Sequence, residues 1–477
     1  MCWNLRVTGS KAALVAIASS VLLTITIGLL GPSAVVPALP GEAWQPPYSL
    51  AAHPGPYLVI ALSALAVVTG GVGLVAGLVR PPAVDPRRLV TAGYAAAGLL
   101  AFLPPSGSAD HLNYAAYGRM VTLGLNPYVH GAIGLPGDPV AGAVEEPWRE
   151  EPSVYGPVAT AVQALASWIG GDSVKLTIFV LAVVNAAAFI GTGLLIDRFT
   201  RHDPVLRLRG ALLWTANPLL IYQLVAGMHI DTLAIAFMVA ALLSRAHPVG
   251  GGALLGLGVA VKLNAGLVAL GPAWELRRRP GRLALMAGTA LAVVAVGYVI
   301  AGSAAFDQLG RTSKAISFAS PWKLVQGWLQ GLFGSGAYRA EIQVGALLLM
   351  ALLAWRLLRA SGREADAPRV AAVLAIAYLV ATPYILPWYD GLAFGLLALV
   401  AASALDRFMA AHLAILSLGY LPARIQEVPD DVEWLRTVVR AGLVPWALLA
   451  LTVALGWWAW RAGARAPRRP EPAAPRP

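Results

Sequence analysis

The chain has 477 residues, of which 58% are hydrophobic and only 12% are charged, and its mean hydropathy is +0.68. Because soluble globular domains carry about 25% charged residues, this composition excludes that class and indicates a polytopic membrane protein. The net charge of +11 does not indicate nucleic-acid binding, since no basic run carries interleaved aromatic residues, and the single Cys2 excludes an intrachain disulfide framework and a Cys-rich metal site.

Membrane spans are predicted from apolar runs of about 17 to 25 residues. The first run is longer than a signal-peptide core and is expected to stay in the protein as a span. The predicted spans lie near residues 12–30, 57–79, 89–104, 174–196, 209–225, 230–244, 282–302, 342–359, 369–384, 390–405, 408–421 and 438–460.

The interval from Gly250 to Trp274 is interrupted by Lys262, Asn264 and Pro272 and has basic flanks. We predict two short helices that enter from the cytoplasm and return to it, with Lys262 at their turn. An unpaired cation inside a membrane costs about 2.5 to 3.5 kcal/mol, so Lys262 is expected to snorkel or to pair with an acid. With this pair counted or left out, the predicted fold is an all-α bundle of about 12 to 14 transmembrane helices.

Basic and acidic residues alternate between successive intervals of the chain, and the basic intervals include both ends. By the positive-inside rule, both termini are predicted to be cytoplasmic. Within the outer segments, short amphipathic stretches near 158–169 and 322–333 are predicted to form interfacial helices. Residues 1–461 are predicted to form one transmembrane catalytic domain, followed by a disordered cytoplasmic tail at 462–477. The predicted outer segments are residues 106–169, 304–341 and 421–437.

The longest polar interval follows the third predicted span and contains the sequence from Asp110 to Arg119. In a helix, Asn113 and Tyr114 lie about one turn from Asp110, and Arg119 is expected to border the same cavity. A carboxylate beside a cation at a wet membrane face could deprotonate a hydroxyl group and hold a phosphate. The alternative is that Asp110 only caps the start of a surface helix.

Two further groups of polar and aromatic residues are expected at the outer ends of spans. His229 and Asp231 follow a very short connection, where the alternative is an ordinary capped helix pair with Asp231 as the N-cap. No further histidine pair or carboxylate motif supports a metal site there. Trp388 and Tyr389 lie in a helix break, where they could stack on a sugar ring or belong to the interfacial aromatic belt.

Five motifs occur in order along the chain: Asp110-His-Leu-Asn-Tyr-Ala-Ala-Tyr-Gly-Arg119, Gly-Leu-Asn-Pro-Tyr128, Tyr-Gly-Pro157, Asn217-Pro218-Leu219 and Gly-Met-His-Ile-Asp231. In this order they resemble the bacterial polyprenol-phosphomannose-dependent alpha-1,6-mannosyltransferases, which belong to the C-type membrane glycosyltransferases. The resemblance covers most of the chain from about Leu89 onward. One departure is that the usual pair of adjacent acids is reduced here to Asp110 alone, between Ala109 and His111.

The resemblance implies an inverting mannosyltransferase of the bacterial plasma membrane, with its active site on the extracytoplasmic face and Asp110 as the general base. It implies polyprenyl-phosphate mannose as the donor, a lipid-linked glycan as the acceptor, contact with membrane lipid and no cofactor or metal. Five cations could hold the phosphate of the donor: Arg119, Arg149, Arg311, Lys314 and Lys323. The candidate substrate-binding residues are Asn113, Tyr114, Arg119, Arg149, Tyr155, His229, Asp231, Lys314, Lys323, Trp388 and Tyr389.

Two other functions are compatible with these residues. A related arabinosyl or glucosyl transferase would differ only in pocket contacts that the sequence does not reveal. A lipid or sugar transporter (flippase) is the alternative from another class, but such proteins often carry internal repeats, and no repeat relates the two halves of this chain. No nucleotide-binding glycine motif and no P-loop occurs, so a nucleotide-sugar donor finds no support.

Overall fold

The computed structural model describes residues 2–307, 315–360 and 365–465. Within these ranges the regular elements are all helices, and the one bridge between extended residues, Ser33 with Val36, is isolated. The all-α prediction is therefore confirmed.

Six stretches of helix in the described ranges are long and apolar enough to cross a membrane. Shorter apolar helices, α9 (Asp231–Leu243), α10 (Pro248–Val261) and α16 (Ala367–Ala381), accompany them. Together they confirm a polytopic membrane protein. The six stretches are Lys11–Leu30 in α1 (Cys2–Leu30), α2 (Pro56–Val79), α6 (Val174–Thr200), α12 (Pro280–Ala301), α15 (Arg339–Ala360) and Asp430–Ala464, which includes α19 (Val444–Arg465).

Two of the predicted spans are not continuous helices. The stretch predicted at 209–225 is divided into α7 (Pro204–Leu213), α8 (Pro218–Leu220) and the π-helix η4 (Ile221–Ala226). The Asn217 side chain caps the restart by accepting from the backbone N–H groups of Leu219 and Leu220, and Pro218 suits a first helical turn. The sequence prediction missed this break because the stretch stays apolar on both sides of it.

The stretch predicted at 390–405 is also shorter than expected. The 3₁₀ turn η6 (Pro387–Asp390) leads into α17 (Gly391–Leu397), and the next helix is α18 (Leu405–Gly419). Arg209 holds this break: its guanidinium donates to the carbonyls of Leu397 (2.9 Å) and Val400 (2.7 Å) and forms a buried ion pair with Asp406. A cation from another helix thus satisfies carbonyl groups that the ended helix leaves without partners.

The interval around Lys262 folds as two helices joined by a turn, as the sequence analysis predicted. α10 is followed by the 3₁₀ helix η5 (Leu263–Ala269) and by α11 (Leu270–Leu276), and Lys262 lies in extended conformation between them. The Lys262 ammonium pairs with Asp231 at 2.6 Å, which confirms that this cation finds an acid.

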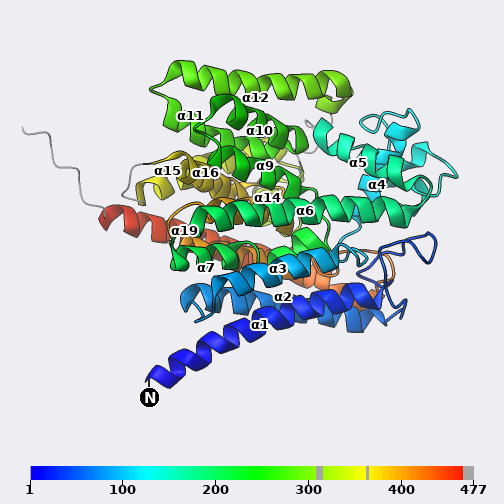
Figure 1. Cartoon of the computed structure of the whole chain (residues 1–477), viewed down its shortest axis with the longest axis horizontal. Coiled ribbons are helices and arrows are strands. Elements are labelled where there is room, and N and C mark those ends of the chain that lie inside the picture. Colours follow the sequence, from blue (N-terminus) through cyan, green and yellow to red (C-terminus); the bar gives the residue numbers. More distant parts are fainter. Residues whose placement is uncertain (1, 308–314, 361–364, 466–477) are drawn as a thin grey trace, which may run out of the picture.

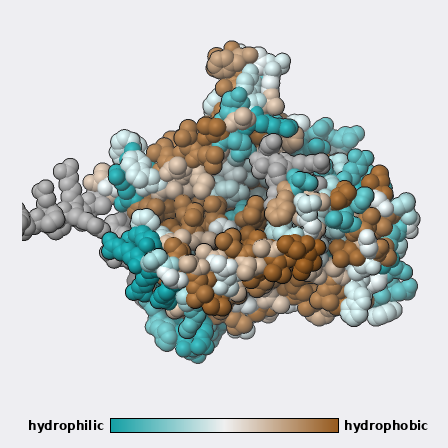
Figure 2. All heavy atoms as spheres, turned by 90° about the horizontal axis from the view of Figure 1, so that it is seen from above, coloured by the Kyte–Doolittle hydropathy of each residue, from teal (hydrophilic) through white to brown (hydrophobic). Residues whose placement is uncertain are grey.

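The segment between α3 (Pro86–Leu100) and α6 contains α4 (Asp110–Thr122) and α5 (Pro157–Gly170), with three 3₁₀ turns between them. In Figure 1 α4 and α5 lie at one end of the bundle, whereas the start of α1 and the last turns of α19 lie at the opposite end. Figure 2 shows apolar side chains over much of the middle of one face, with hydrophilic ones mostly toward its edges. The three turns are η1 (Ala132–Gly134), η2 (Ala141–Ala143) and η3 (Trp148–Glu150).

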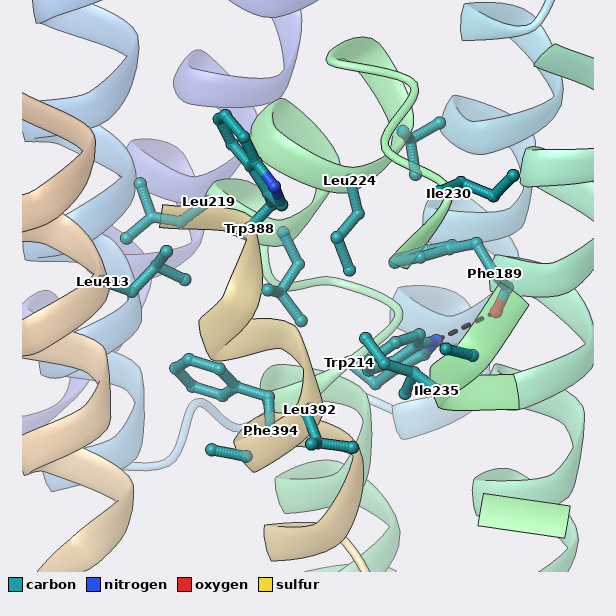
Figure 3. Close-up of a cluster of buried hydrophobic side chains, with 14 of the residues drawn as sticks. Phe189, Trp214, Leu219, Leu224, Ile230, Ile235, Trp388, Leu392, Phe394 and Leu413 are labelled. Atoms are coloured by element: carbon teal, nitrogen blue, oxygen red, sulfur yellow. Dashed lines mark hydrogen bonds between the residues drawn. The ribbon is translucent and has the colours of Figure 1, made fainter. Parts of the chain in front are cut away.

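The second predicted interfacial stretch forms α14 (Trp322–Phe333), which has no buried residue and exposes Leu332 and Phe333. Further inside, the core contains Trp214, whose ring stacks on Phe189 at 5.0 Å and whose indole N–H donates to the Phe189 carbonyl at 2.9 Å (Figure 3). Trp388 belongs to the same cluster, near Leu219 and Leu224, so the break at Pro387 is anchored in the core.

Candidate active site

Asp110 is the first residue of α4, and its side chain does not cap that helix. The N-cap is Ala109, which makes no side-chain cap bond, and the Asp110 backbone N–H donates to the Ser108 hydroxyl at 3.1 Å. The Asp110 side chain is 28% exposed and directs Oδ2 toward Nδ1 of His229, 3.5 Å away. The carboxylate therefore faces another element rather than its own backbone.

Asp110 combines partial exposure with an environment that favours its protonated form. Burial raises the pKa of Asp110 to about 6, while Ser108 and the charge of Lys262 lower it and the charge of Asp231 raises it further. A carboxylate with a pKa nearer neutrality is a stronger proton acceptor than an ordinary aspartate, which is what a general base requires.

His229 lies in the turn between η4 and α9 and is fully buried. Its ring stacks on Trp388, with centroids 3.6 Å apart and planes 12° from parallel. Neither ring nitrogen makes a hydrogen bond of good geometry within the described residues, although Nδ1 lies close to Asp110. Burial, and secondarily the charges of Lys262 and His111, lower the pKa of His229 well below its usual value, so the ring is neutral near pH 7.

Asp231 and Lys262 form an ion pair next to these two residues. Asp231 is the first residue of α9 but its cap position is Ile230, and its Oδ1 accepts from Lys262 Nζ at 2.6 Å. The same ammonium lies 3.9 Å from the centroid of the Tyr389 ring. The interpretation of Asp231 as a simple N-cap is therefore wrong.

Tyrosines surround this polar group. The hydroxyl of Tyr155 donates to that of Tyr114 at 3.3 Å, and the two rings meet edge to face at 5.1 Å. Tyr117 lies near Tyr155, and its hydroxyl donates to the Glu151 carbonyl at 3.0 Å. Asn113 lies one turn beyond Asp110 on α4 and is partly exposed. Tyr114, Tyr155, Asp110, His229 and Asp231 are thus brought together from three separate elements.

The aromatic residues predicted to stack on a sugar are engaged with the protein. Trp388 is 2% exposed, and His229 covers one face of its ring. The Lys262 ammonium lies over the Tyr389 ring. Within the described residues they therefore orient His229 and Lys262.

The predicted phosphate-binding cations do not gather at Asp110. Arg119 stands nine residues along α4, about 13 Å along the helix axis, and is paired with Asp138 at 2.7 Å and with Asp172. Arg149 pairs with Glu146 at 3.7 Å, and Lys323 donates to the side chain of Gln326 at 3.0 Å. Arg119 was expected to border the same cavity as Asp110, but its guanidinium is paired with acids about two and a half turns further along α4. Arg311 and Lys314 fall outside the described residues.

The sequence analysis did not single out three residues that the structure places here. Ser108 accepts from the Asp110 N–H and also interacts with Tyr420, at the end of α18. Tyr420 meets the Trp388 ring edge to face at 5.1 Å. His111 is fully buried beside Asp110. No spacing in the sequence connects residue 420 with residue 108, so only the neighbouring His111 could have been noticed.

No metal centre emerges from the part of the chain that the structure describes: it contains no group of three or more His, Cys, Asp or Glu side chains placed to hold an ion.

Comparisons with known proteins agree on one group of enzymes. The family model described as alpha-(1->6)-mannopyranosyltransferase, N-terminal domain, matches residues 14–278, which contain Asp110, His229, Asp231 and Lys262. The chain is 25% identical over 400 residues to alpha-(1->6)-mannopyranosyltransferase A of Corynebacterium glutamicum, a match that covers 74% of this chain and 78% of that protein.

Two shorter matches carry the same description. The chain is 28% identical over 202 residues to alpha-(1->6)-mannopyranosyltransferase B of Corynebacterium glutamicum, covering 42% of this chain and 31% of the relative. It is 27% identical over 252 residues to alpha-(1->6)-mannopyranosyltransferase A of Mycobacterium tuberculosis, covering 48% of this chain and 43% of the relative. These two matches span less than half of each relative.

Proposed function

The chain belongs to the alpha-(1->6)-mannopyranosyltransferase family, and we propose that it transfers mannose from a polyprenyl-phosphate donor to a hydroxyl group of a lipid-linked mannan or glycolipid. The reaction takes place at the outer face of the bacterial plasma membrane and forms an alpha-1,6 linkage. Both termini are cytoplasmic in this proposal, which is supported by the start of α1 and the last turns of α19 lying at the end of the bundle opposite α4 and α5 (Figure 1).

The observation that carries the proposal is the pairing of a partly exposed Asp110 with the buried, neutral His229 at 3.5 Å. Asp110 accepts the proton of the acceptor hydroxyl while that oxygen attacks the anomeric carbon of mannose. The bond from that carbon to the phosphate oxygen breaks on the opposite face, and its electron pair leaves with polyprenyl phosphate. A beta-linked donor then gives an alpha-linked product.

A lipid-borne donor suits a protein with this surface. Each buried methylene of a polyprenyl chain contributes about 0.8 kcal/mol to membrane binding, so the sugar must be met at the membrane face. The site residues lie near helix ends and not within a soluble domain. Lys262, between α10 and η5, contacts them through its ion pair with Asp231.

The experiment is transfer of radiolabelled mannose from polyprenyl-phosphate mannose in isolated membranes. We expect Asp110→Asn to lower transfer by about two to four orders of magnitude, the usual contribution of a positioned base, with unchanged expression. Glu150→Gln is the matched control, since Glu150 is an exposed acid in the same segment. Near-wild-type transfer by Asp110→Asn would contradict the assignment.

The same assay separates the other candidate functions. Polyprenyl-phosphate arabinose and glucose are supplied as competitors, and preferential use of either would replace mannose as the donor sugar. Movement of labelled lipid across the membrane without transfer to an acceptor would indicate a flippase instead.

A further inference from the structure

Two arginines on the π-helix η8 (Leu435–Leu443) form a cationic feature that the site described above does not include. The Arg440 guanidinium donates to the Gly419 carbonyl through Nε at 2.7 Å, and through Nη2 to the carbonyls of Tyr420 and of Pro422, the latter at 3.0 Å. Its Nη1 makes no hydrogen bond with the described residues. Neither Arg440 nor Arg436 forms an ion pair within that part of the chain.

Among the residues that the structure describes, no carboxylate offsets the positive charge of these two arginines. Backbone carbonyls offer only partial negative charge, and Arg436 stands four residues before Arg440 in the same helix, a spacing at which like charges repel. π-helices are rare in proteins, and those that occur are often found at functional sites. Two arginines that face no carboxylate are suited to an anion that accepts several hydrogen bonds, such as a phosphate.

A short series of contacts connects Arg440 with the candidate active site. The guanidinium carbon lies 5.0 Å from the centroid of the Tyr420 ring, and that ring meets Trp388 edge to face at 5.1 Å. Trp388 in turn stacks on His229, the neighbour of Asp110. Arg440 is thus separated from the stacked pair of Trp388 and His229 by one aromatic ring.

The surroundings of η8 are those of a membrane boundary. Val438 and Leu443 on this helix and Trp434 at its N-cap are exposed apolar side chains, and the helix belongs to the apolar stretch Asp430–Ala464. A guanidinium flanked by exposed apolar groups matches a ligand with an anionic head and a hydrocarbon tail.

We propose that Arg440, assisted by Arg436, binds the phosphate of the polyprenyl-phosphate-sugar donor. This inference rests on the proposed function and specifies the subsite that the donor head group occupies. When the bond between the anomeric carbon and the phosphate oxygen breaks, the phosphate gains the electron pair, and the two guanidinium groups stabilise the added charge. Arg440 and Arg436 thereby take the role expected from Arg119, Arg149 and Lys323, which are engaged elsewhere.

The competing explanation is that Arg440 only fastens the turn after α18 through its three carbonyl contacts. If Arg440 has only this structural role, its loss affects folding but not the preference of the protein for polyprenyl phosphate over polyprenol. The measurement is therefore the Kd of the purified full chain in lipid nanodiscs for polyprenyl phosphate, for polyprenol of the same length and for inorganic phosphate.

We expect the wild type to bind polyprenyl phosphate about ten- to a hundred-fold more tightly than polyprenol, since hydrogen bonds to charged groups are worth that much. Arg440→Gln should lose most of this preference, and Arg440→Lys should keep part of it. Arg461→Gln is the matched control, because the Arg461 guanidinium carbon also lies over an aromatic ring, 4.3 Å from the centroid of Trp457, but near the end of α19 that is remote from η8. Its Kd should equal that of the wild type.

Three outcomes would overturn the inference: unchanged polyprenyl phosphate binding by Arg440→Gln, equal wild-type affinity for polyprenol, or equal affinity for inorganic phosphate. If Arg440→Gln fails to fold, Arg436→Gln replaces it, because Arg436 does not hold the turn, and the same loss of preference is expected. Asp110→Asn should bind polyprenyl phosphate normally without transferring mannose. Absence of transfer by the wild type would refute the proposed function, whereas unaltered Kd values in the arginine variants would refute this inference alone.

Discussion

At the scale of single residues, burial moves the pKa values of Asp110 and His229 in opposite directions. The pKa of Asp110 is raised to about 6 and that of His229 is lowered well below its usual value, in both cases chiefly by burial. Near neutral pH the pair therefore consists of a carboxylate and a neutral imidazole. Trp388 fixes the plane of that imidazole by stacking. Of these two groups, Asp110 is therefore the one that titrates near pH 6.

We predict that mannose transfer falls as the pH drops through about 6, because protonated Asp110 cannot accept a proton. Below that value kcat/KM should decrease about tenfold for each pH unit. Lys262→Met should move this acid limb to higher pH, since the charge of Lys262 lowers the pKa of Asp110. A profile that stays flat between about pH 4.5 and 8 would contradict the role of Asp110.

A second prediction concerns the ion pair of Asp231 and Lys262. Asp231→Asn leaves the Lys262 charge, whose side chain is only 15% exposed, without its acid. We expect a loss of about 3 kcal/mol in the free energy of unfolding, at the low end for a broken buried pair because Lys262 is partly exposed. Thermal inactivation in detergent measures it.

The double variant Asp231→Asn with Lys262→Met provides the control, since it removes both charges. It should recover most of the stability but not the activity. If the double variant is no more stable than Asp231→Asn, the pair is not what holds this region.

At the scale of elements, the site residues come from places where helices are interrupted. His229 follows the π-helix η4 and precedes α9, Lys262 lies between α10 and η5, and Trp388 lies in η6. Helix ends expose backbone groups and side chains that a continuous span would bury in its neighbours. The interruptions therefore place polar side chains at one level of the bundle without a soluble domain.

The start of α5 lies against the end of α10, and this contact positions residues 106–169, which include Asp110, relative to Lys262. The Gly156 N–H donates to the Val261 carbonyl at 3.0 Å, and a Cβ at Gly156 would lie 2.2 Å from the Ala260 carbonyl oxygen. We predict that Gly156→Ala costs about 1 to 3 kcal/mol and lowers transfer, because α5 must move away from Ala260, which lies two residues before Lys262.

Gly142→Ala is the matched control for this change, as no atom lies within 4 Å of its added Cβ. Protease sensitivity of the segment from Ser106 to Ile169 should rise in Gly156→Ala and not in Gly142→Ala. Equal activity and equal cleavage of the two variants would show that the contact is dispensable.

At the scale of the whole molecule, contacts between distant segments close the end that carries the site. Arg424 pairs with Glu145 at 3.0 Å and also donates to the Ser33 carbonyl, and the Tyr57 hydroxyl donates to Asp431 at 2.9 Å. These bonds connect the beginning of the chain, the segment of Asp110 and the segment before η8. The subsites on α4 and η8 are thereby held in one assembly.

We predict that EDTA leaves transfer largely unchanged, because the chemistry needs a base and cations that side chains supply. The measurement is initial rate in membranes washed with chelator, with and without added Mg²⁺, Mn²⁺ or Ca²⁺. Complete loss of activity that a divalent ion restores would establish a metal requirement and contradict this prediction.

The class of the protein and several of the site residues could be predicted from the amino-acid sequence. Apolar run lengths and low charge content dictate membrane helices, since backbone groups in hydrocarbon must be satisfied within the segment. For the same energetic reason, an intramembrane Lys262 was expected to snorkel or to pair with an acid, and the structure pairs it with Asp231. The polar interval at Asp110 and the pair His229 and Asp231 stood out because polar residues in such a chain collect where helices end.

The tertiary structure alone decided which of these residues meet. Asp110, His229 and Trp388 come from segments more than a hundred residues apart, and their contacts depend on how α4, α9 and η6 pack. It also decided that Arg119 is bound by Asp138 and Asp172, whereas Arg440 contacts carbonyl groups and the Tyr420 ring but no carboxylate of the described residues. A sequence pattern indicates whether a residue lies in water or in hydrocarbon and which residues are its neighbours along the chain. The partners of a charge depend on contacts between elements, so only the packed structure distinguishes a neutralised arginine from one left to bind a phosphate.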